Sequence, residues 1–348
     1  MGFIINNDQQ RQRISISPET MIVLEQDVSD FNLDGLGELV NDILIYREKY
    51  NLTQDSLLKQ YCEQTYSYLQ KAGIDSDIND ILEKLCDLKK KEIIERIGTF
   101  KTHKRGNIGK NIYIKQRTLR WLESPENTED LYYGGSLLLY LNSVIEEYAQ
   151  KDLYTRERII TNERVSKINA YIKDQEWVNV YWPNKRSVRF FPIKILPDKL
   201  NTHAYLACYT LSDDGALKPS SFRMSALPDD MQIAHGYNPT VTESDIKTID
   251  ELISERRIDF LAYTAEDIQV RLTKHGMKRY LRTTRLRPDI INSKDSKSKS
   301  TICTFHCTKQ QAEYYFAQFG EDVEIISPQP LRERFIQIYQ NALTAYNT

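Results

Sequence analysis

The side chains best suited to chemistry in this sequence are cations gathered between positions 271 and 287. That segment holds seven Lys and Arg residues, one His and no acid, whereas the whole chain has a formal net charge of −2. Clustered cations on a slightly acidic protein suit the phosphates of a nucleic acid, because each neutralised phosphate releases counterions. A solvated helix face is the alternative interpretation. We expect phosphate contacts from Arg271, Lys278, Arg279, Arg282 and Arg285.

A second candidate surface lies at positions 11–16, where polar and apolar residues largely alternate. The alternation predicts a short half-buried strand. Its outward residues, Arg11, Arg13 and Ser15, are candidates for contact with bases, and a merely solvated strand face is the alternative. Ser17 followed by Pro18 predicts that a helix starts directly after the strand. A second helix is expected from about position 36 to position 50.

The same pattern recurs 98 positions later in the chain. Residues 13–50 align with residues 111–148 without a gap, and ten positions are identical, most of them at expected strand, core or turn positions. The approach to this second copy is basic, which adds Lys104 and Arg105 to the candidate contacts. The two copies pair either within one chain or between two chains, and pairing between chains would make a dimer obligatory.

One strand and two helices within about 40 residues resemble the ribbon-helix-helix family. The resemblance implies that two strands pair into an antiparallel ribbon, whose outward residues enter the major groove of DNA. In this chain those residues would be Arg11, Arg13 and Ser15.

Positions 175–236 carry short strands separated by turns, which is typical of a small SH3- or Sm-like barrel. The residues here resemble the WYL family. Its naming tripeptide stands at 204–206 as Ala-Tyr-Leu, after Val-Arg-Phe-Phe-Pro at 188–192 and before Phe-Arg-Met at 222–224. The sequence departs from the family at two positions, because the tryptophan of the tripeptide is Ala204 and a late arginine is Ala226.

The WYL resemblance implies a ligand-binding module, often one that binds nucleic acid. Carried over by position, its groove would use Tyr205 and Arg223, with Tyr181 and Arg189 as neighbours. A core tyrosine with a satisfied hydroxyl is the alternative for Tyr205. Positions 246–348 resemble the C-terminal extension that accompanies many WYL domains, through Val-Arg-Leu-Thr at 270–273 and Phe-Gly at 319–320. Residues 291–300 of this extension are expected to form a mobile loop.

These patterns together predict an α+β chain. Ribbon-helix-helix-like units occupy residues 1–51 and 99–150, and a helical connector at 52–98 contains two helices split near residue 73. A linker helix at 151–174 leads to the WYL barrel at 175–236, and an α/β extension occupies 246–348.

No motif for catalysis is present, because the sequence lacks a P-loop, a glycine-rich dinucleotide turn and a nucleophile motif. We therefore expect a protein without enzyme activity, cofactor or metal. The five cysteines suggest no disulfide framework, and alternation at 302–307 favours a buried strand face over zinc ligation for Cys303 and Cys307. No bilayer-length apolar stretch or signal pattern is found, which predicts a cytoplasmic protein without membrane contact.

The whole architecture is similar to the WYL accessory proteins of type VI-D CRISPR systems. That resemblance implies a protein that binds single-stranded RNA and modulates a CRISPR effector RNase, with bases stacked on tyrosines such as Tyr181, Tyr205 and Tyr209. A homodimer is also expected. The alternative is a DNA-binding transcription regulator, in which the ribbon contacts duplex DNA and the WYL module senses a ligand.

Overall fold

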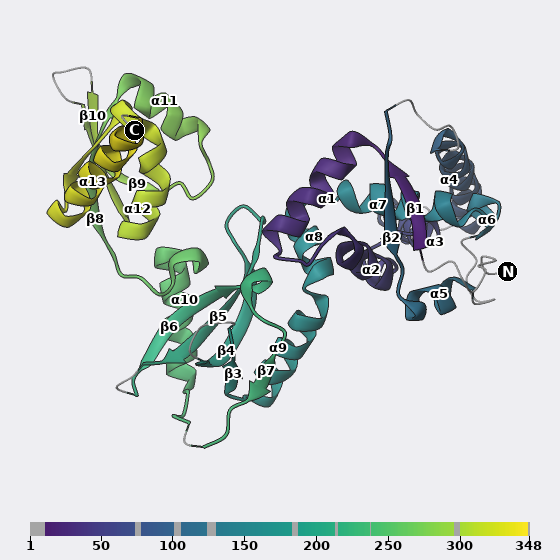
Figure 1. Ribbon diagram of the computed structural model, residues 1–348, viewed down its shortest axis with the longest axis horizontal. Helices are drawn as coiled ribbons and strands as arrows, with labels where there is room; N and C mark the ends of the chain where they lie inside the picture. Colours follow the sequence, from purple (N-terminus) through teal and green to yellow (C-terminus); the bar gives the residue numbers. More distant parts are fainter. Residues whose placement is uncertain are drawn as a thin grey trace. The chain divides into compact units, whose positions relative to one another are not determined.

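The computed structural model of the chain describes residues 11–73, 78–100, 106–123, 130–182, 187–212, 215–236, 238–295 and 300–346. The chain divides into two compact units, Met1–Ser166 and Lys167–Thr348. The first contains a two-stranded sheet, and the second contains a five-stranded and a four-stranded sheet (Figure 1). In the parts of the chain described, no helix combines the length and the hydropathy that a membrane span requires.

The first unit contains a two-stranded antiparallel ribbon of β1 (Arg11–Ile16) and β2 (Ile108–Tyr113). One chain therefore supplies both strands, so pairing within the chain is the arrangement formed, and the ribbon requires no second chain. The helices of this unit are α1 (Pro18–Asp30), α2 (Leu36–Tyr46), α3 (Gln54–Lys71), α4 (Ile78–Phe100), α5 (Gln116–Glu123), α6 (Asp130–Tyr133), α7 (Leu137–Ala149) and α8 (Leu153–Ile160), and α9 (Asn162–Asp174) begins here.

Local sequence explains why the first strand and helix form where they do. Ile14 and Ile16 alternate with polar residues and are fully buried in the core of the unit. The Ser17 side chain caps α1 by accepting a hydrogen bond from the Thr20 amide at 3.2 Å, and Pro18 occupies the first turn. The predicted boundary between this strand and this helix is confirmed.

Each half of the unit packs its last helix against the strand of the other half. Asn142 in α7 accepts a hydrogen bond from the Ser15 amide of β1 at 3.0 Å. Asn41 in α2 donates to the Tyr113 carbonyl of β2 at 2.8 Å. The two strand-helix segments are therefore intertwined, and neither could bury its apolar residues alone.

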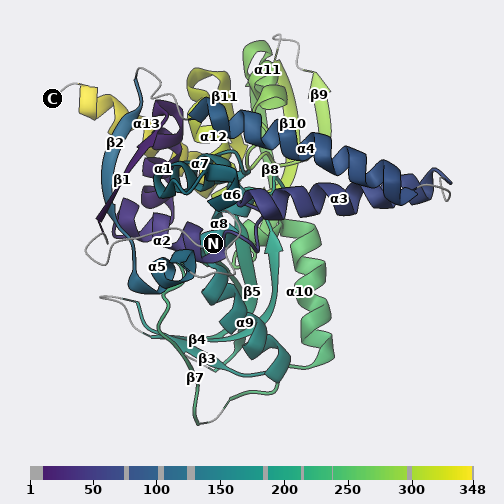
Figure 2. The same ribbon diagram turned by 90° about the vertical axis from the view of Figure 1, so that its right-hand side faces the viewer.

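The predicted connector is an antiparallel pair of helices, α3 and α4, which lie side by side in Figure 2. A disulfide joins Cys62 in α3 to Cys86 in α4, with a Cα–Cα distance of 6.0 Å. The expectation that the cysteines form no disulfide is therefore wrong for this pair. Helix pairing brings together residues that the sequence separates by 24 positions. The predicted linker helix is also divided, since α8 ends at Ile160 and α9 begins at Asn162.

The second unit begins with a five-stranded antiparallel sheet in the order β6-β5-β4-β3-β7. Helix α10 (Glu243–Arg256) and the 3-10 turn η2 (Ile258–Phe260) contribute to its core through Ile249 and Ile258, which pack in one cluster with Trp177. The strands are β3 (Val178–Val180), β4 (Val188–Pro197), β5 (Ala204–Leu211), β6 (Leu217–Arg223) and β7 (Met231–Ile233), and the 3-10 turn η1 (Met224–Ala226) links β6 to β7.

The predicted barrel is not closed in this sheet. Strands β6 and β7 lie at opposite edges, and β7 pairs with β3 rather than with β6. Both β3 and β7 have only three residues, too few to carry the sheet round to its other edge. The rhythm of strands and turns correctly predicted short strands separated by turns, but it contained no information about closure.

The C-terminal sheet has the antiparallel order β11-β8-β10-β9. Strand β10 buries Cys303 and Cys307, so the predicted strand face is confirmed, and burial raises the pKa of the Cys307 thiol to about 12. Residues 291–295 belong to a strand, so the predicted mobile loop is wrong there, and 296–299 lie outside the described residues. The elements are β8 (Ala265–Thr273), α11 (Lys274–Arg282), β9 (Ile290–Asp295), β10 (Ser300–Thr308), α12 (Lys309–Phe316), the 3-10 segment η3 (Ala317–Asp322), β11 (Val323–Ser327) and α13 (Gln329–Tyr346).

Candidate nucleic-acid interface

The outward face of the ribbon gathers polar residues from both strands. Arg11 and Arg13 are exposed and Ser15 is half-buried, because the isoleucines between them occupy the inward face. Arg11 lies opposite Tyr113, and Arg13 lies opposite Asn111. The ribbon therefore places two cations and an exposed aromatic ring on one surface.

Gly109 gives the Arg13 side chain its position on this surface. A Cβ atom at Gly109 would lie 2.9 Å from Nη2 of Arg13 and 3.0 Å from its Nε. The guanidinium thus lies over the neighbouring strand, where any other residue would displace it. In this position the planar Arg13 guanidinium extends its N–H donors across the ribbon, where they can bind phosphate oxygens or base edges.

The predicted contacts left out two residues of the ribbon face, Asn111 and Tyr113, which stand in the second copy of the repeat at the positions of Arg13 and Ser15. Tyr113 is 58% exposed. The register of β1 against β2 identifies them, and the 98-residue repeat was the available signal. The predicted contacts Lys104 and Arg105 lie outside the described residues.

In the first sheet of the second unit, Arg189 is held by the protein itself. Its guanidinium donates to the Asn179 and Asn238 side chains at 3.2 and 3.3 Å and to the His235 carbonyl at 3.3 Å. These contacts tie β4 to β3 and to the segment after β7. We assign Arg189 a structural role in this sheet rather than a role as an open ligand contact.

Tyr205 and Arg223 are cross-strand partners on β5 and β6, so their side chains share one face of the sheet. Both are half-buried, and Tyr205 packs against the apolar cluster that contains Trp177. The structure therefore brings together the two residues that the WYL resemblance places in a groove. Tyr181 follows β3 and is 45% exposed, which leaves its ring accessible for stacking. Tyr209 is buried, so its ring is not open to a base as expected from the sequence.

Three cations of the basic segment at 271–287 are engaged within the protein. Arg271 forms an ion pair with Glu324, a carboxylate whose pKa is lowered chiefly by Arg332. Arg279 donates to the Phe319 and Gln318 carbonyls at 3.0 and 2.6 Å. Arg287 donates to the Leu281 carbonyl at 3.2 Å. Two of the predicted phosphate contacts, Arg271 and Arg279, are therefore already engaged within the protein, and their contact with phosphate stays a prediction.

The cations that remain open form a stripe on α11. Lys274, Lys278 and Arg282 are four residues apart, so they lie on one helix face, and all three are exposed. Their side chains make no ion pair or hydrogen bond with any described residue. Arg285, just after the helix, is also exposed, and its charge acts on the carboxylate of Asp259. We call Lys274, Lys278 and Arg282 the α11 stripe.

Close packing fixes α11 to the sheet. A Cβ atom at Gly276 would lie 2.4 Å from the Asp322 carbonyl oxygen, so the helix approaches η3 at a distance that only glycine allows. The Asp322 carboxylate accepts hydrogen bonds from the Thr273 hydroxyl at 2.6 Å and lies 2.6 Å from His275 Nδ1. These contacts hold the pKa of Asp322 below its usual range. The α11 stripe is therefore carried on a helix with a fixed position.

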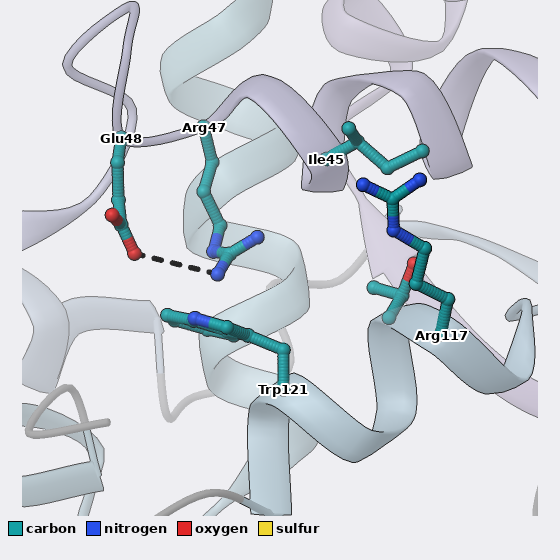
Figure 3. A pocket seen from close by; sticks show the side chains of 6 residues that line it. Ile45, Arg47, Glu48, Arg117 and Trp121 are labelled. Atoms are coloured by element: carbon teal, nitrogen blue, oxygen red, sulfur yellow. Dashed lines mark hydrogen bonds and ion pairs between the residues drawn. The ribbon is translucent and has the colours of Figure 1, made fainter. Parts of the chain in front are cut away.

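The first unit also contains a pocket of about 190 Å³ between the end of α2 and the start of α5. The Arg47 guanidinium lies 3.1 Å from the centre of the Trp121 ring and pairs with Glu48 at 3.4 Å (Figure 3). Arg117 extends from α5 on the other side of the pocket. No sequence pattern indicated this pocket, because its lining comes from segments about 70 residues apart. Ile45 and Thr118 complete the lining.

Comparisons with known proteins place the fold. No family model matches the chain, and no curated protein matches it. A structure of the proteasome accessory factor B/C (PafBC) of Arthrobacter aurescens has a TM-score of 0.25 and 11% identity, covering 69% of this chain and 37% of that one, too low a score to support any argument. A crystal structure described as a CRISPR Cas-related protein has a TM-score of 0.70 and 21% identity, covering 99% of this chain and 98% of that one. The chain shares the fold of that CRISPR Cas-related protein over nearly its whole length.

Proposed function

We propose that this chain is a non-catalytic accessory protein that binds single-stranded RNA and modulates an RNA-guided RNase of a type VI-D CRISPR system. The observation that carries the proposal is the presence of open cations on the ribbon face and on the α11 stripe of a chain with a net charge of −2. Cations that make no internal ion pair can exchange counterions for phosphates.

Exposed aromatic rings favour an unpaired strand over a duplex as the ligand. Tyr113 lies beside Arg11 on the ribbon, and Tyr181 is exposed on the first sheet of the second unit. Bases of single strands stack on such rings while cations hold the backbone, and a paired helix offers no free base faces. Tyr205, which is half-buried, lies opposite Arg223 and is a second ring beside a cation.

The connection with CRISPR rests on the shared fold with a CRISPR Cas-related protein, together with the resemblance read in the sequence. We interpret the first unit as two ribbon-helix-helix-like halves fused in one chain. We interpret the five-stranded sheet as a WYL module, because four strands in a meander lead through η1 to a fifth that pairs with the first. A homodimer remains part of the proposal, and since the ribbon is complete within one chain, it would use another surface.

One observation favours a second candidate, a regulator that binds duplex DNA. The ribbon presents Arg11 and Arg13 outward, and arginines on a two-stranded ribbon can enter a major groove and pair with guanine.

Affinities for matched single-stranded RNA and duplex DNA, measured at one stated salt concentration, test the proposal. We expect tighter binding of single-stranded RNA, and a change in the cleavage rate of a type VI-D effector when the chain is added. Tighter binding of duplex DNA would support the second candidate. Binding of neither would overturn both candidates.

A further inference from the structure

Two equivalent threonines in the two halves of the first unit differ in their hydrogen-bond partners. Thr20 and Thr118 match in the 98-residue repeat, and each lies in the first turn of the helix after its strand. Their exposed fractions are alike, 5% and 4%. In the first half, the Glu146 carboxylate accepts hydrogen bonds from the Thr20 hydroxyl at 2.5 Å and from the Ser17 amide at 2.9 Å.

In the second half, no carboxylate of the described residues occupies the corresponding place. Glu48 is the counterpart of Glu146, but α2 ends at Tyr46, whereas α7 continues to Ala149. Glu48 therefore lies beyond its helix and pairs with Arg47. The Thr118 hydroxyl is buried and has no hydrogen-bond partner among the described residues.

The pocket between α2 and α5 lies where the missing carboxylate would be expected, since Thr118 and Glu48 both line it. Its volume of about 190 Å³ exceeds the roughly 30 Å³ that one water molecule occupies in the liquid several-fold. The Lys115 amide, counterpart of the Ser17 amide, already donates to Asn41 at 2.8 Å. A ligand in this pocket would thus be held by side chains.

The charges around Thr20 and Thr118 also differ, and positive charge is gathered around Thr118. The second half has exposed cations at Lys115, Arg117 and Arg120, where the first half has Ser17, Glu19 and Ile22. Arg47 adds a fourth cation, stacked on Trp121. The half in which the Glu146 carboxylate contacts the threonine has no cations at these places. The half without such a carboxylate has four cations there.

We propose that this pocket binds a phosphate group. The Thr118 hydroxyl donates to a phosphate oxygen as the Thr20 hydroxyl donates to Glu146, and Arg117 supplies a charge-assisted hydrogen bond. Glu48 is 62% exposed and turns toward solvent when the anion enters. The phosphate comes either from the free ion or from the backbone of a nucleic-acid strand, and the two sources share this chemistry.

Indole NMR signals of the full chain provide the test, because the chain has only three tryptophans. Trp121→Phe identifies the signal of Trp121, which lies in the pocket wall. Inorganic phosphate is titrated at constant ionic strength, and a short single-stranded oligonucleotide is titrated separately. We expect a saturable shift of the Trp121 signal, weakened about tenfold or more in Thr118→Val and Arg117→Gln.

Two control variants separate binding from folding. Lys59→Gln removes an exposed cation on α3 and should bind phosphate as the parent chain does. Thr20→Val should lower the melting temperature by breaking the bond to Glu146, yet leave phosphate affinity unchanged. Thr118→Val should leave the melting temperature unchanged or raise it, because it removes a buried hydroxyl that has no partner.

The outcomes distinguish the sources and can contradict the proposal. A shift with inorganic phosphate supports a site for the free ion, and a shift with the oligonucleotide alone supports a backbone phosphate. No shift with either, or equal shifts in Thr118→Val and Arg117→Gln, overturns the proposal. Inorganic phosphate tests the pocket directly. The result therefore does not depend on whether the chain binds RNA at the ribbon and at α11.

Discussion

The ribbon face and the basic segment at 271–287 both looked like runs of cations, but the structure uses them differently. On the ribbon, strand alternation sends every second residue outward, so Arg11 and Arg13 are both exposed. In the basic segment, Arg271, Arg279 and Arg287 bond to the protein, whereas the α11 stripe stays open. A count of like charges therefore overestimates the contacts available to a ligand unless each cation's internal partners are known.

The difference has a local physical cause. Backbone carbonyls in η3 need donors, and the long side chain of Arg279 reaches the Gln318 and Phe319 carbonyls there. Arg271 faces Glu324 from the neighbouring strand β11. Among the described residues, no acceptor bonds to the side chain of Arg11 or Arg13, so these cations are left for solvent or a ligand.

The largest effect should come from the α11 stripe. Replacing Lys274, Lys278 and Arg282 with Gln should weaken RNA binding by about ten- to a hundredfold. The log–log salt slope should become shallower by about 2, since each single-strand phosphate contact contributes ~0.7. Filter binding at several salt concentrations measures both quantities. The matched control replaces Arg271 and Arg287, and if that control lost as much of the slope, the division into open and engaged cations would be wrong.

The ribbon face should give the next largest effect. Arg11→Gln with Arg13→Gln should make the salt slope shallower by about 1.4, from two contacts at ~0.7 each. The melting temperature should stay within a degree or two, because Ile14 and Ile16 remain buried. An unchanged slope would remove the ribbon from the RNA interface and leave the α11 stripe as the main contact.

Replacing Arg279 should lower the stability of the fold and leave RNA binding unchanged. Arg279→Gln loses two hydrogen bonds to carbonyl groups, each worth about 0.5–1.5 kcal/mol, so the free energy of unfolding should fall by about 1–3 kcal/mol. Urea denaturation measures this loss. RNA affinity measured well below the melting temperature should be retained. A drop in RNA affinity without any loss of stability would mean that Arg279 contacts RNA.

A smaller effect is expected at the seat of Arg13. Gly109→Ala places a methyl group against the far end of that flexible side chain, so the guanidinium moves while the strand stays in place. RNA affinity should fall a few-fold, and circular dichroism should not change. The same substitution in the Arg13→Gln background should have no further effect on affinity. An added loss there would mean that Gly109 does not act through the position of the Arg13 guanidinium.

The smallest effect is a pH dependence of the segment that carries the α11 stripe. The pKa of Asp322 is lowered, first by the Thr273 hydroxyl and then by His275. Its carboxylate therefore stabilises the fold at pH values above about 4, and the stabilisation is lost as the pH falls through the lowered pKa. Asp322→Asn should melt earlier than the parent chain at pH 7, and the gap should close toward pH 2. A gap that stayed constant with pH would mean that the carboxylate charge contributes nothing.

Short-range patterns in the sequence predicted much of the fold. Alternation located β1, and Ser17-Pro18 located the start of α1, because both signals act between neighbouring residues. The 98-residue repeat indicated the second strand. What could not be predicted depends on distant contacts, such as sheet closure and the pairing of Cys62 with Cys86.

The sequence indicated the residue types of the candidate site but not the internal partners of each cation. Residue types alone indicated cations beside aromatic rings, and the structure keeps Tyr205 next to Arg223. The engagement of Arg279 depends on carbonyls about 40 positions away, which no local pattern reports. The pocket at Trp121 depends on where α2 ends, and helix ends are the boundaries that sequence locates least well.

Photo-cross-linking of the full chain to single-stranded RNA that carries 4-thiouridine tests the central claim most directly. Mass spectrometry then identifies the peptides attached to RNA. Binding at the open cations predicts cross-links on the ribbon peptides around Arg13 and Tyr113 and on the α11 peptide that contains Lys278. Cross-links confined to other surfaces, or none at an RNA concentration that saturates the parent chain, would contradict it.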